Sequence, residues 1–354
     1  MMQTEGRLPP DASVADYADD YVVPAGAGDS HWLSTQRSVL VRPPTDDDFK
    51  YLHPLELFLQ KNVVNICAPM VRYSKHAFRL LVRKYDCHLA FTPMIVSNCF
   101  VRSIKARDAD FTTTYDDRPL IVQFAANNSY DFANATEIVA PFSDGVDLNC
   151  GCPQRWAMAE GYGACLLRKP DLLCDMVKQA RTRVGNDNFT VSVKIRVHKD
   201  IRETVDLCQK VEKMGVSFLT VHGRTKDQRC EPVDLDAVRT VKDSVSIPVV
   251  ANGDIQLIND VKEVVEKTGV NGVMAARGIL ANPAMFAGYN ETPVDCIKDW
   301  MDIALSTGTP FSCFHHHLIF MLEHVLTKSE RNVFNSLMST SAILDFLRYN
   351  YDIS

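Results

Sequence analysis

Short apolar runs alternate with amphipathic helical patterns between residue 49 and about residue 276, and this alternation limits the folds open to the chain. Runs rich in β-branched residues, each followed by a helical stretch, indicate parallel strands connected by helices. Eight such runs predict an α/β fold, a (β/α)8 TIM barrel. The expected strands are 63–70, 88–94, 119–125, 145–149, 190–196, 217–222, 248–252 and 272–276. The expected helices between them are 75–84, 130–140, 171–183, 202–214, 235–242 and 257–267.

A doubly wound open sheet is the alternative, but no Gly-x-Gly-x-x-Gly sequence follows the first expected strand. Beyond residue 290 the strand pattern stops, and amphipathic stretches predict a small helical domain. We therefore expect a disordered acidic tail at 1–48, a barrel domain at 49–290 and a helical domain at 291–354. The last domain should contain helices at 294–305, 311–326 and 332–349, separated by Pro310 and by the charged segment 328–331.

The acidic side chains are concentrated near the N-terminus. Residues 1–48 carry nine acidic and three basic residues, which accounts for the whole net charge of −6. The rest of the chain is neutral, so its basic residues can still cluster on one face and contact nucleic acid. No apolar run approaches the ~18 residues of a membrane span, and the N-terminus lacks the pattern of a secretory signal.

Eleven cysteines are scattered without paired spacing, which predicts reduced thiols in the cytosol or the nucleus. The close pair Cys150 and Cys152 has no second pair to complete a zinc site, so we expect no metal. Cys152 follows an apolar strand on a loop shaped by Gly151 and Pro153, which can hold its thiol toward a ligand. A lone cysteine is otherwise more often an inert small hydrophobe.

Polar or conformationally special residues stand at the carboxyl ends of seven of the eight expected strands, where such barrels carry their chemistry. Singly, each has an ordinary explanation, such as a solvated lysine or an Asn-Gly-Asp turn. Together they converge, and buried charges and amides are costly unless a polar ligand pairs with them. The residues concerned are Pro69, Met70, Gln123, Asn149, Lys194, Arg196, His222, Arg224, Asn252, Gly253, Asp254, Ala276 and Arg277.

These strand ends suit a phosphorylated flavin. Arg277-Gly278 at a helix start, beside Asn252-Gly253, can offer a guanidinium and backbone N–H groups to a phosphate. Lys194 would stabilise the electron-rich N1–C2=O edge of a reduced flavin, with His222 nearby, and Gln123 can bond its carbonyl and imide edge. We therefore expect FMN across the barrel mouth with Cys152 above it.

The same residues resemble the motifs of the tRNA-dihydrouridine synthase family over about residues 62–290. The motifs are Ala68-Pro69-Met70, Val122-Gln123, Asp147-Leu148-Asn149-x-Gly151-Cys152-Pro153, Gly163-Ala164-x-Leu166-Leu167, Lys194-Ile195-Arg196, His222-Gly223-Arg224-Thr225, Asn252-Gly253-Asp254 and Ala276-Arg277-Gly278. The segments 154–157 and 280–286 look most like the eukaryotic branch that acts at positions 20a and 20b of the D-loop.

The resemblance implies an FMN barrel followed by a helical tRNA-binding domain, with NADPH or NADH as reductant and tRNA as substrate. It assigns Cys152 as the proton donor to C5 of a uridine, while the flavin N5 delivers hydride to C6. By the same resemblance, Asn149, Arg196 and Arg224 are expected to contact the substrate. The FMN contacts fall on Pro69, Met70, Val71, Gln123, Lys194, His222, Asn252, Gly253, Asp254, Ala276 and Arg277.

The chain departs from many family members in three respects. Cys150 stands where many have methionine, Arg155 and Trp156 stand where many bacterial members have lysine, and the C-terminal domain is short. Candidate contacts to tRNA phosphates are Arg102, Lys105, Arg107, Arg155, Arg168 and Lys169. The His315-His316-His317 tract resembles a metal-binding sequence, but three consecutive helical side chains point in different directions and cannot share one ion. We therefore expect this tract at the surface or against tRNA.

Two other classes of function stay open from the sequence. One is an FMN barrel oxidoreductase that acts on a small pyrimidine-like molecule without tRNA. The other is a non-catalytic tRNA-binding protein, which would be colourless when purified. It predicts losses among Cys152, Lys194 and His222, and the presence of all three disfavours it. We expect a monomer without a membrane partner, in the cytoplasm or the nucleus.

Overall fold

The computed structural model describes residues 51–353, so the acidic tail expected at 1–48 lies outside the described residues. Parallel strands form one sheet that closes on itself, since β2 pairs with β4 and β1 pairs with both β2 and β9. The predicted (β/α)8 barrel is confirmed. The strands are β1 (Val64–Cys67), β2 (Leu89–Phe91), β3 (Ile95–Val96), β4 (Leu120–Ala125), β5 (Gly145–Cys150), β6 (Thr190–Arg196), β7 (Phe218–His222), β8 (Val249–Asn252) and β9 (Gly272–Ala275).

The strand expected at 88–94 is shorter than predicted, and a separate two-residue strand follows it. Thr92 still donates its N–H to the carbonyl oxygen of Ile121 at 3.0 Å, but Pro93 has no N–H to continue the ladder. The chain then pairs again as β3, opposite the last two residues of β4. The closed barrel therefore has eight strands, and β3 extends it at the carboxyl end of β4.

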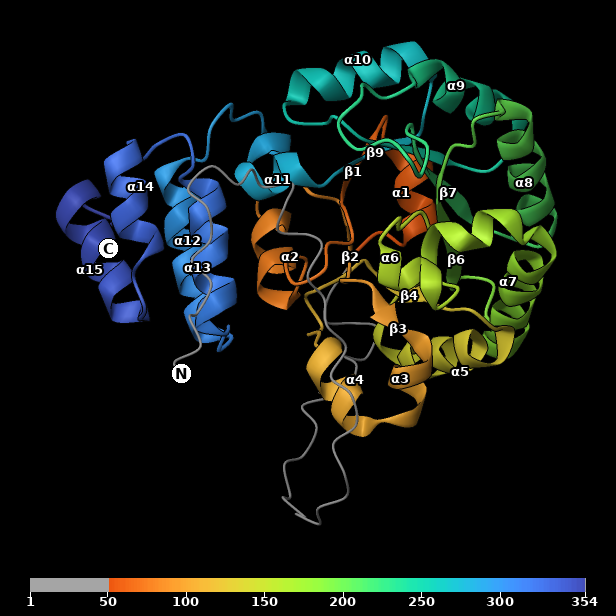
Figure 1. Cartoon of the computed structure of the whole chain (residues 1–354), viewed down its shortest axis with the longest axis horizontal. Helices are drawn as coiled ribbons and strands as arrows, with labels where there is room; N and C mark the ends of the chain where they lie inside the picture. The colour runs from red at the N-terminus through yellow and green to blue at the C-terminus, as the bar shows by residue number, and fades with distance from the viewer. Residues whose placement is uncertain (1–50, 354) are drawn as a thin grey trace, which may run out of the picture. The chain divides into compact units, whose positions relative to one another are not determined.

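Helices follow the strands, and α7 to α10 lie one after another around the outside of the barrel (Figure 1). The six interstrand helices predicted from the sequence are observed within two residues of their expected bounds. No helix in residues 51–353 is long and apolar enough to cross a bilayer. The helices through the barrel are α1 (Pro54–Gln60), α2 (His76–Arg83), α3 (Ser97–Arg102), α4 (Ile104–Asp110), α5 (Ser129–Val139), α6 (Arg155–Ala159), α7 (Pro170–Val184), α8 (Ile201–Lys213), α9 (Leu235–Ser244), α10 (Ile258–Thr268) and α11 (Arg277–Ala281).

The amino-terminal end of the barrel is filled by aromatic side chains. Phe58 of α1 packs against Phe218 at the start of β7, with ring centroids 5.3 Å apart, and Phe91 of β2 lies 6.4 Å from Phe218. A Cβ on Gly272, at the start of β9, would lie 3.3 Å from the Phe58 ring. The apolar side chains that fill this end leave the carboxyl ends of the strands to carry the polar residues.

The C-terminal segment contains four helices in place of the three predicted. They are α12 (Val294–Ser306), α13 (Phe311–Met321), α14 (Lys328–Asn335) and α15 (Thr340–Tyr351). The single helix expected at 332–349 was wrong, and the charged segment 328–331 begins α14 instead of separating two helices. Thr327 and Glu330 form a capping box there, and the Ser339 side chain accepts the N–H of Ala342 to begin α15.

The histidine tract lies in α13, and two of its members are buried, contrary to the surface position expected from the sequence. His315 is paired with the carbonyl oxygen of Phe334 at 3.0 Å, and His317 with that of Tyr73 at 3.1 Å. The His317 ring also stacks on Phe78 of α2, with centroids 4.3 Å apart. His316 is exposed. The tract therefore joins α13 to α2 and α14 through aromatic packing.

Candidate active site

Most of the predicted site residues lie at the carboxyl ends of β5 to β9, while Gln123 lies within β4 and Pro69, Met70 and Val71 follow β1. The strand register places Asn149 beside Lys194, Arg196 beside His222, and His222 beside Asn252. At the junction of β1 and β9, the N–H of Ala68 donates to the carbonyl oxygen of Ala275 at 3.0 Å. Pro69, Met70 and Val71 therefore follow β1 next to the point where Ala276 and Arg277 follow β9.

Lys194 reaches across the barrel to β8. Its Nζ donates to Oδ1 of Asn252 at 2.8 Å, and the Asn252 amide nitrogen donates to the carbonyl oxygen of Met274 at 2.8 Å. These two contacts fix which way the Asn252 amide points. Burial, reinforced by the positive charge of Arg196, lowers the pKa of Lys194 to about 8. The lysine is thus largely charged at neutral pH and suited to a polar partner with electron-rich oxygen or nitrogen atoms.

His222 is held neutral among cations. Burial, together with the positive charges of Lys194, Arg196, Arg224 and Arg277, lowers its pKa to about 2. Four cationic side chains therefore surround one neutral imidazole at the ends of β6 to β9. Such a concentration of positive charge favours an anionic ligand.

Arg224 and Asp254 form an ion pair at the ends of β7 and β8. Nη2 of Arg224 lies 2.6 Å from both carboxylate oxygens of Asp254, and its Nε donates to the carbonyl oxygen of Glu231. Arg277 approaches the same carboxylate at 3.8 Å and remains half exposed. The sequence assigned Arg224 to substrate and Asp254 to cofactor, and the structure places the two side chains against each other.

Gly253 allows the chain to pass close to His222. Its φ of 119° lies in a region that other residues avoid. A Cβ at this position would lie 2.5 Å from Cγ1 of Val233 and 2.8 Å from Cδ2 of His222. The close approach explains why the turn after β8 contains glycine.

Gln123 and Asn149 belong to a chain of buried hydrogen bonds. Nε2 of Gln123 donates to Oδ2 of Asp147 at 2.9 Å, and Nδ2 of Asn149 donates to Oε1 of Gln123 at 2.9 Å. Oδ1 of Asn149 accepts the N–H groups of Gly151 at 3.2 Å and Cys152 at 2.9 Å. Gln123 is fully buried and Asn149 nearly so. The amide that the sequence assigned to the flavin therefore contacts the residues that hold the thiol loop.

Cys152 is partly exposed on the loop after β5, whereas Cys150 is fully buried and burial raises the pKa of its thiol well above the ordinary value. The back of Cys152 packs on an apolar cluster that comprises Met94, Val96, Ala125, Trp156, Ala157 and Tyr162. Gly163, with φ 62°, passes so close that a Cβ would lie 2.5 Å from the Cys152 carbonyl oxygen. Of these two thiols, only that of Cys152 is partly exposed, so it is the candidate to contact a ligand.

Arg196 donates hydrogen bonds to the loop after β5, which carries the thiol, and to the loop after β7. Its Nε donates to the carbonyl oxygen of Gly151 at 3.0 Å, and its Nη1 donates to those of Thr225 at 2.9 Å and Gln228 at 3.2 Å. Lys194 and Arg196 both interact electrostatically with Cys152. Arg196 thus joins the loop after β5 to the loop after β7.

Three residues that contact the site residues were given no individual role from the sequence: Asp147, Ser192 and Gly163. Alternation along a strand was an available signal, because Asp147 stands two residues before Asn149 and Ser192 two residues before Lys194. Each therefore shares a face with a predicted site residue. The role of Gly163 depends on a long-range approach to Cys152 that no local pattern reveals.

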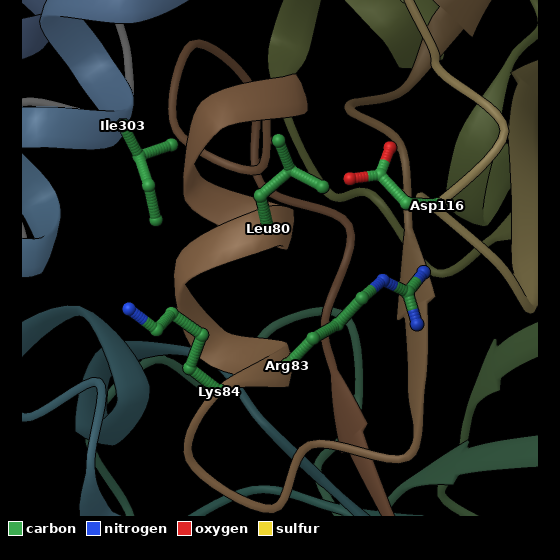
Figure 2. A pocket seen from close by; sticks show the side chains of 5 residues that line it. All are labelled: Leu80, Arg83, Lys84, Asp116 and Ile303. Atoms are coloured by element: carbon green, nitrogen blue, oxygen red, sulfur yellow. The ribbon is translucent and has the colours of Figure 1, made fainter.

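A pocket of about 390 Å³ lies away from these strand ends, between α2 and α12, as Figure 2 shows. Its charged side chains already have partners, since Arg83 pairs with Asp117 at 3.2 Å and Lys84 pairs with Asp299. A second cavity of about 290 Å³ lies next to the thiol loop, between η3 (Gly163–Arg168) and the loops after β6 and β7. Arg168 and His198 are among its lining residues. The second cavity adjoins the candidate site and the first does not.

Several candidate phosphate contacts lie on elements around the thiol loop. Arg102 ends α3, Arg155 begins α6 and Arg168 ends η3. Arg102 also lies 3.3 Å from Asp131 and stays largely exposed. In residues 51–353, no group of three or more His, Cys, Asp or Glu side chains is arranged to hold a metal ion.

Comparison with known proteins identifies the family. The profile described as "Dihydrouridine synthase (Dus)" matches residues 66–343. A human protein named tRNA-dihydrouridine(20a/20b) synthase [NAD(P)+]-like is 59% identical over 300 residues, covering 85% of this chain and 95% of that protein. A Saccharomyces cerevisiae protein named tRNA-dihydrouridine(20a/20b) synthase [NAD(P)+] is 41% identical over 295 residues, covering 82% and 80%. The solved structure of histamine dehydrogenase from a Rhizobium species has a TM-score of 0.50 at 12% identity over 68% of this chain and 48% of that one. This chain belongs to the dihydrouridine synthase family.

Proposed function

We propose that this chain reduces the C5–C6 double bond of uridines at positions 20a and 20b of the tRNA D-loop, with bound FMN as cofactor and NADPH or NADH as reductant. The observation that carries the proposal is the accessible Cys152 thiol beside Lys194 and Arg196 at the carboxyl ends of the strands. Family membership and the names of the relatives from human and yeast support the reaction and the position.

The residues present suit FMN. The cations around neutral His222 match an anionic cofactor, and half-exposed Arg277 is available to its phosphate. Gly253 lets the turn after β8 pass close to His222, while Lys194 offers a charge to the electron-rich edge of a flavin ring. Residues on the other side of the mouth would be Pro69, Met70, Val71 and Ala276. When bound, the flavin accepts hydride from NADPH or NADH and supplies hydride to C6 of the uracil.

Cys152 supplies the proton. As C6 gains a hydride, negative charge develops on C5 and on the adjacent C4 carbonyl oxygen, and the Cys152 S–H transfers its proton to C5. The thiolate left behind lies near Lys194 and Arg196, which stabilise it until solvent returns a proton. Asn149 holds the loop through the N–H groups of Gly151 and Cys152. Arg196 keeps the loop against the barrel through the carbonyl oxygen of Gly151.

The substrate uridine must leave its stack to reach the thiol. A D-loop base is poorly stacked, so the cost of extrusion is lower than in a helix. Exposed Arg155, Arg168 and Lys169 lie close to Cys152 in sequence and can contact the phosphates around it. The helices α12 to α15 would hold a more distant part of the tRNA. We place the protein, as a monomer, in the cytoplasm or the nucleus.

The proposal is tested by incubating the purified protein with NADPH and a tRNA that lacks D-loop modification, then mapping dihydrouridine by position. Signal at 20a and 20b is expected, together with a yellow protein. Cys152→Ala should keep the flavin and lose most of the product, since the cofactor contacts remain and the acid is gone. Signal elsewhere in the D-loop would contradict the position. Full product formation by Cys152→Ala would remove the thiol from the mechanism.

One outcome of the same assay would favour the small-molecule oxidoreductase considered from the sequence. A yellow protein that oxidises NADPH but forms no dihydrouridine in any unmodified tRNA would contradict the tRNA substrate. The fold and the family would stay as described, because neither depends on the assay.

A further inference from the structure

Asp147 is a fully buried carboxylate in the middle of β5, and the mechanism above gives it no task. Both of its oxygens accept hydrogen bonds from neighbouring strands. Oδ2 accepts from Nε2 of Gln123 on β4 at 2.9 Å, and Oδ1 accepts from Oγ of Ser192 on β6 at 2.7 Å. Burying a carboxylate destabilises the fold unless its hydrogen bonds offset the free energy of desolvation. The presence of a carboxylate at this position therefore needs an explanation.

The hydrogen bonds run in one direction from this carboxylate to the thiol loop. An ionised carboxylate only accepts, so the Gln123 amide must turn its nitrogen toward Asp147 and its oxygen toward Asn149. Asn149 must then turn its nitrogen toward Gln123, which leaves its oxygen for the N–H groups of Gly151 and Cys152. Each amide has two possible orientations, and the acceptor at the start selects one for both.

The reversed arrangement shows what the carboxylate prevents. If Gln123 turned over, its oxygen would face the Asp147 oxygen and its nitrogen would face the nitrogen of Asn149. If Asn149 then turned over as well, its NH2 group would face the N–H groups of Gly151 and Cys152. Both arrangements bring like partners together and leave buried polar groups without hydrogen bonds.

We propose that Asp147 is a positioning residue that orients the Gln123 and Asn149 amides and thereby fixes the loop that carries Cys152. The consequence for catalysis rests on the proposed function of Cys152, but the hydrogen-bond chain itself does not. The acceptor oxygen is what the role requires, and the negative charge is not. Lys194 on β6 interacts electrostatically with Asp147, and burial raises the pKa of Asp147 to about 6, so the carboxylate is ionised at pH 7.5.

Three variants separate the acceptor from the charge and from packing. Asp147→Leu removes the acceptor in a side chain of similar size. Asp147→Asn keeps one oxygen for Gln123 and can donate from its nitrogen to the Ser192 hydroxyl, so it should restore the chain without the charge. Ser192→Ala is the matched control, because it removes the other hydrogen bond of the same carboxylate and leaves the connection to Cys152 intact.

The measurement is amide hydrogen exchange of the segment that contains Gly151 and Cys152, at pH 7.5, with the α7 segment as internal reference. Asp147→Leu should accelerate exchange at Gly151 and Cys152 at least about tenfold and leave α7 within about twofold, since the two N–H groups lose a fixed acceptor. Asp147→Asn and Ser192→Ala should stay within about threefold of the natural chain. In the tRNA assay, Asp147→Leu should lower kcat more than it raises KM.

Unchanged exchange at Gly151 and Cys152 in Asp147→Leu would overturn the proposal, and so would an Asp147→Asn variant as fast as Asp147→Leu. If Asp147→Leu does not fold, Gln123→Leu cuts the chain one link later and must give the same local acceleration; unchanged exchange there would also overturn it. These exchange results hold whether or not the protein modifies tRNA. Failure of the dihydrouridine assay is thus distinguishable from failure of the positioning role.

Discussion

Gly163 sets how closely the chain can pass behind Cys152. The N–H of the next residue, Ala164, donates to the Cys152 carbonyl oxygen at 2.9 Å, so η3 is tied directly to the thiol loop. A Cβ on Gly163 would lie 3.0 Å from the Cβ of Cys152 and closer still to its carbonyl oxygen. Its left-handed φ of 62° adds a second requirement for glycine.

Gly163→Ala should therefore disturb the thiol as well as the fold. The left-handed conformation costs about 1 kcal/mol of unfolding free energy, and the contact with Cys152 adds about 1–3 kcal/mol of overpacking. A displaced thiol should lower the rate of dihydrouridine formation at least about tenfold. Urea denaturation and the tRNA assay measure the two effects.

Gly185→Ala provides the matched control for this comparison. Gly185 ends α7 with a similar φ of 60°, and nothing lies within 4 Å of the position a Cβ would take. It should show the conformational cost alone, with an unchanged reaction rate. Equal loss of stability and activity in both variants would show that the approach of Gly163 to Cys152 is not the cause.

At the residue scale, the sequence predicted which side chains lie together at the strand ends better than it predicted the contacts among them. Lys194, His222 and Asn252 could be predicted because parallel strands bring their carboxyl ends together. The pairing of Arg224 with Asp254 could not, because turn geometry after two different strands decides it. The roles of all these residues toward cofactor and substrate stay predictions. The burial of His315 and His317 was also missed, since an imidazole is amphipathic and packs as readily as it hydrates.

At the scale of elements, the start of α14 shows a signal that was present in the sequence and overlooked. Thr327 accepts the N–H of Glu330 through its side chain, and the Glu330 carboxylate accepts the N–H of Thr327 at 2.8 Å. This Thr-x-x-Glu capping box marks a helix start more strongly than the charges of 328–331 mark a loop. Ser339 similarly begins α15. The strands were easier, because their apolar runs are short and buried on both faces.

Thr327→Ala should weaken α14 by about 1 kcal/mol, because one backbone N–H at the helix start loses its acceptor. Hydrogen exchange in residues 328–335 should accelerate about fivefold, which corresponds to that free energy. Thr327→Ser keeps the hydroxyl and should retain most of the protection. If Thr327→Ser exchanges as fast as Thr327→Ala, the methyl group rather than the hydrogen bond stabilises this end.

At the scale of the whole described chain, the barrel could be predicted from the sequence, but the contacts that attach the C-terminal helices α12 and α13 to it could not. Eight alternating units leave few ways to close a parallel sheet. The attachment depends on contacts between residues more than two hundred positions apart, such as His317 with Tyr73 and Phe78. Trp300 of α12 adds to the same cluster, with its ring 6.4 Å from Phe78 and 4.6 Å from His317. No local pattern encodes such pairs.

The buried contact of His317 with Tyr73, Phe78 and Trp300 should make the free energy of unfolding depend on pH. Burial lowers the pKa of His317 to about 3, whereas an unfolded histidine has a pKa of about 6.5. Between these values the unfolded chain binds a proton that the folded chain excludes. The contribution of His317 is therefore complete above pH ~6.5 and falls by about 1.4 kcal/mol per pH unit below it. His317→Phe keeps the ring stacking and should remove this slope, at the cost of the hydrogen bond to Tyr73.

Urea denaturation of the natural chain and of His317→Phe at pH 7.5, 6.0 and 5.0 measures the slope. Many other groups titrate in this range, so the difference between the two chains is the informative quantity. That difference should shrink or change sign as the pH falls, because only the natural chain must exclude a proton from this position. His324→Phe, at an exposed position in the same C-terminal region, controls for the substitution of a histidine by phenylalanine outside this cluster. If the difference in unfolding free energy is the same at all three pH values, His317 accepts a proton while it keeps its buried position.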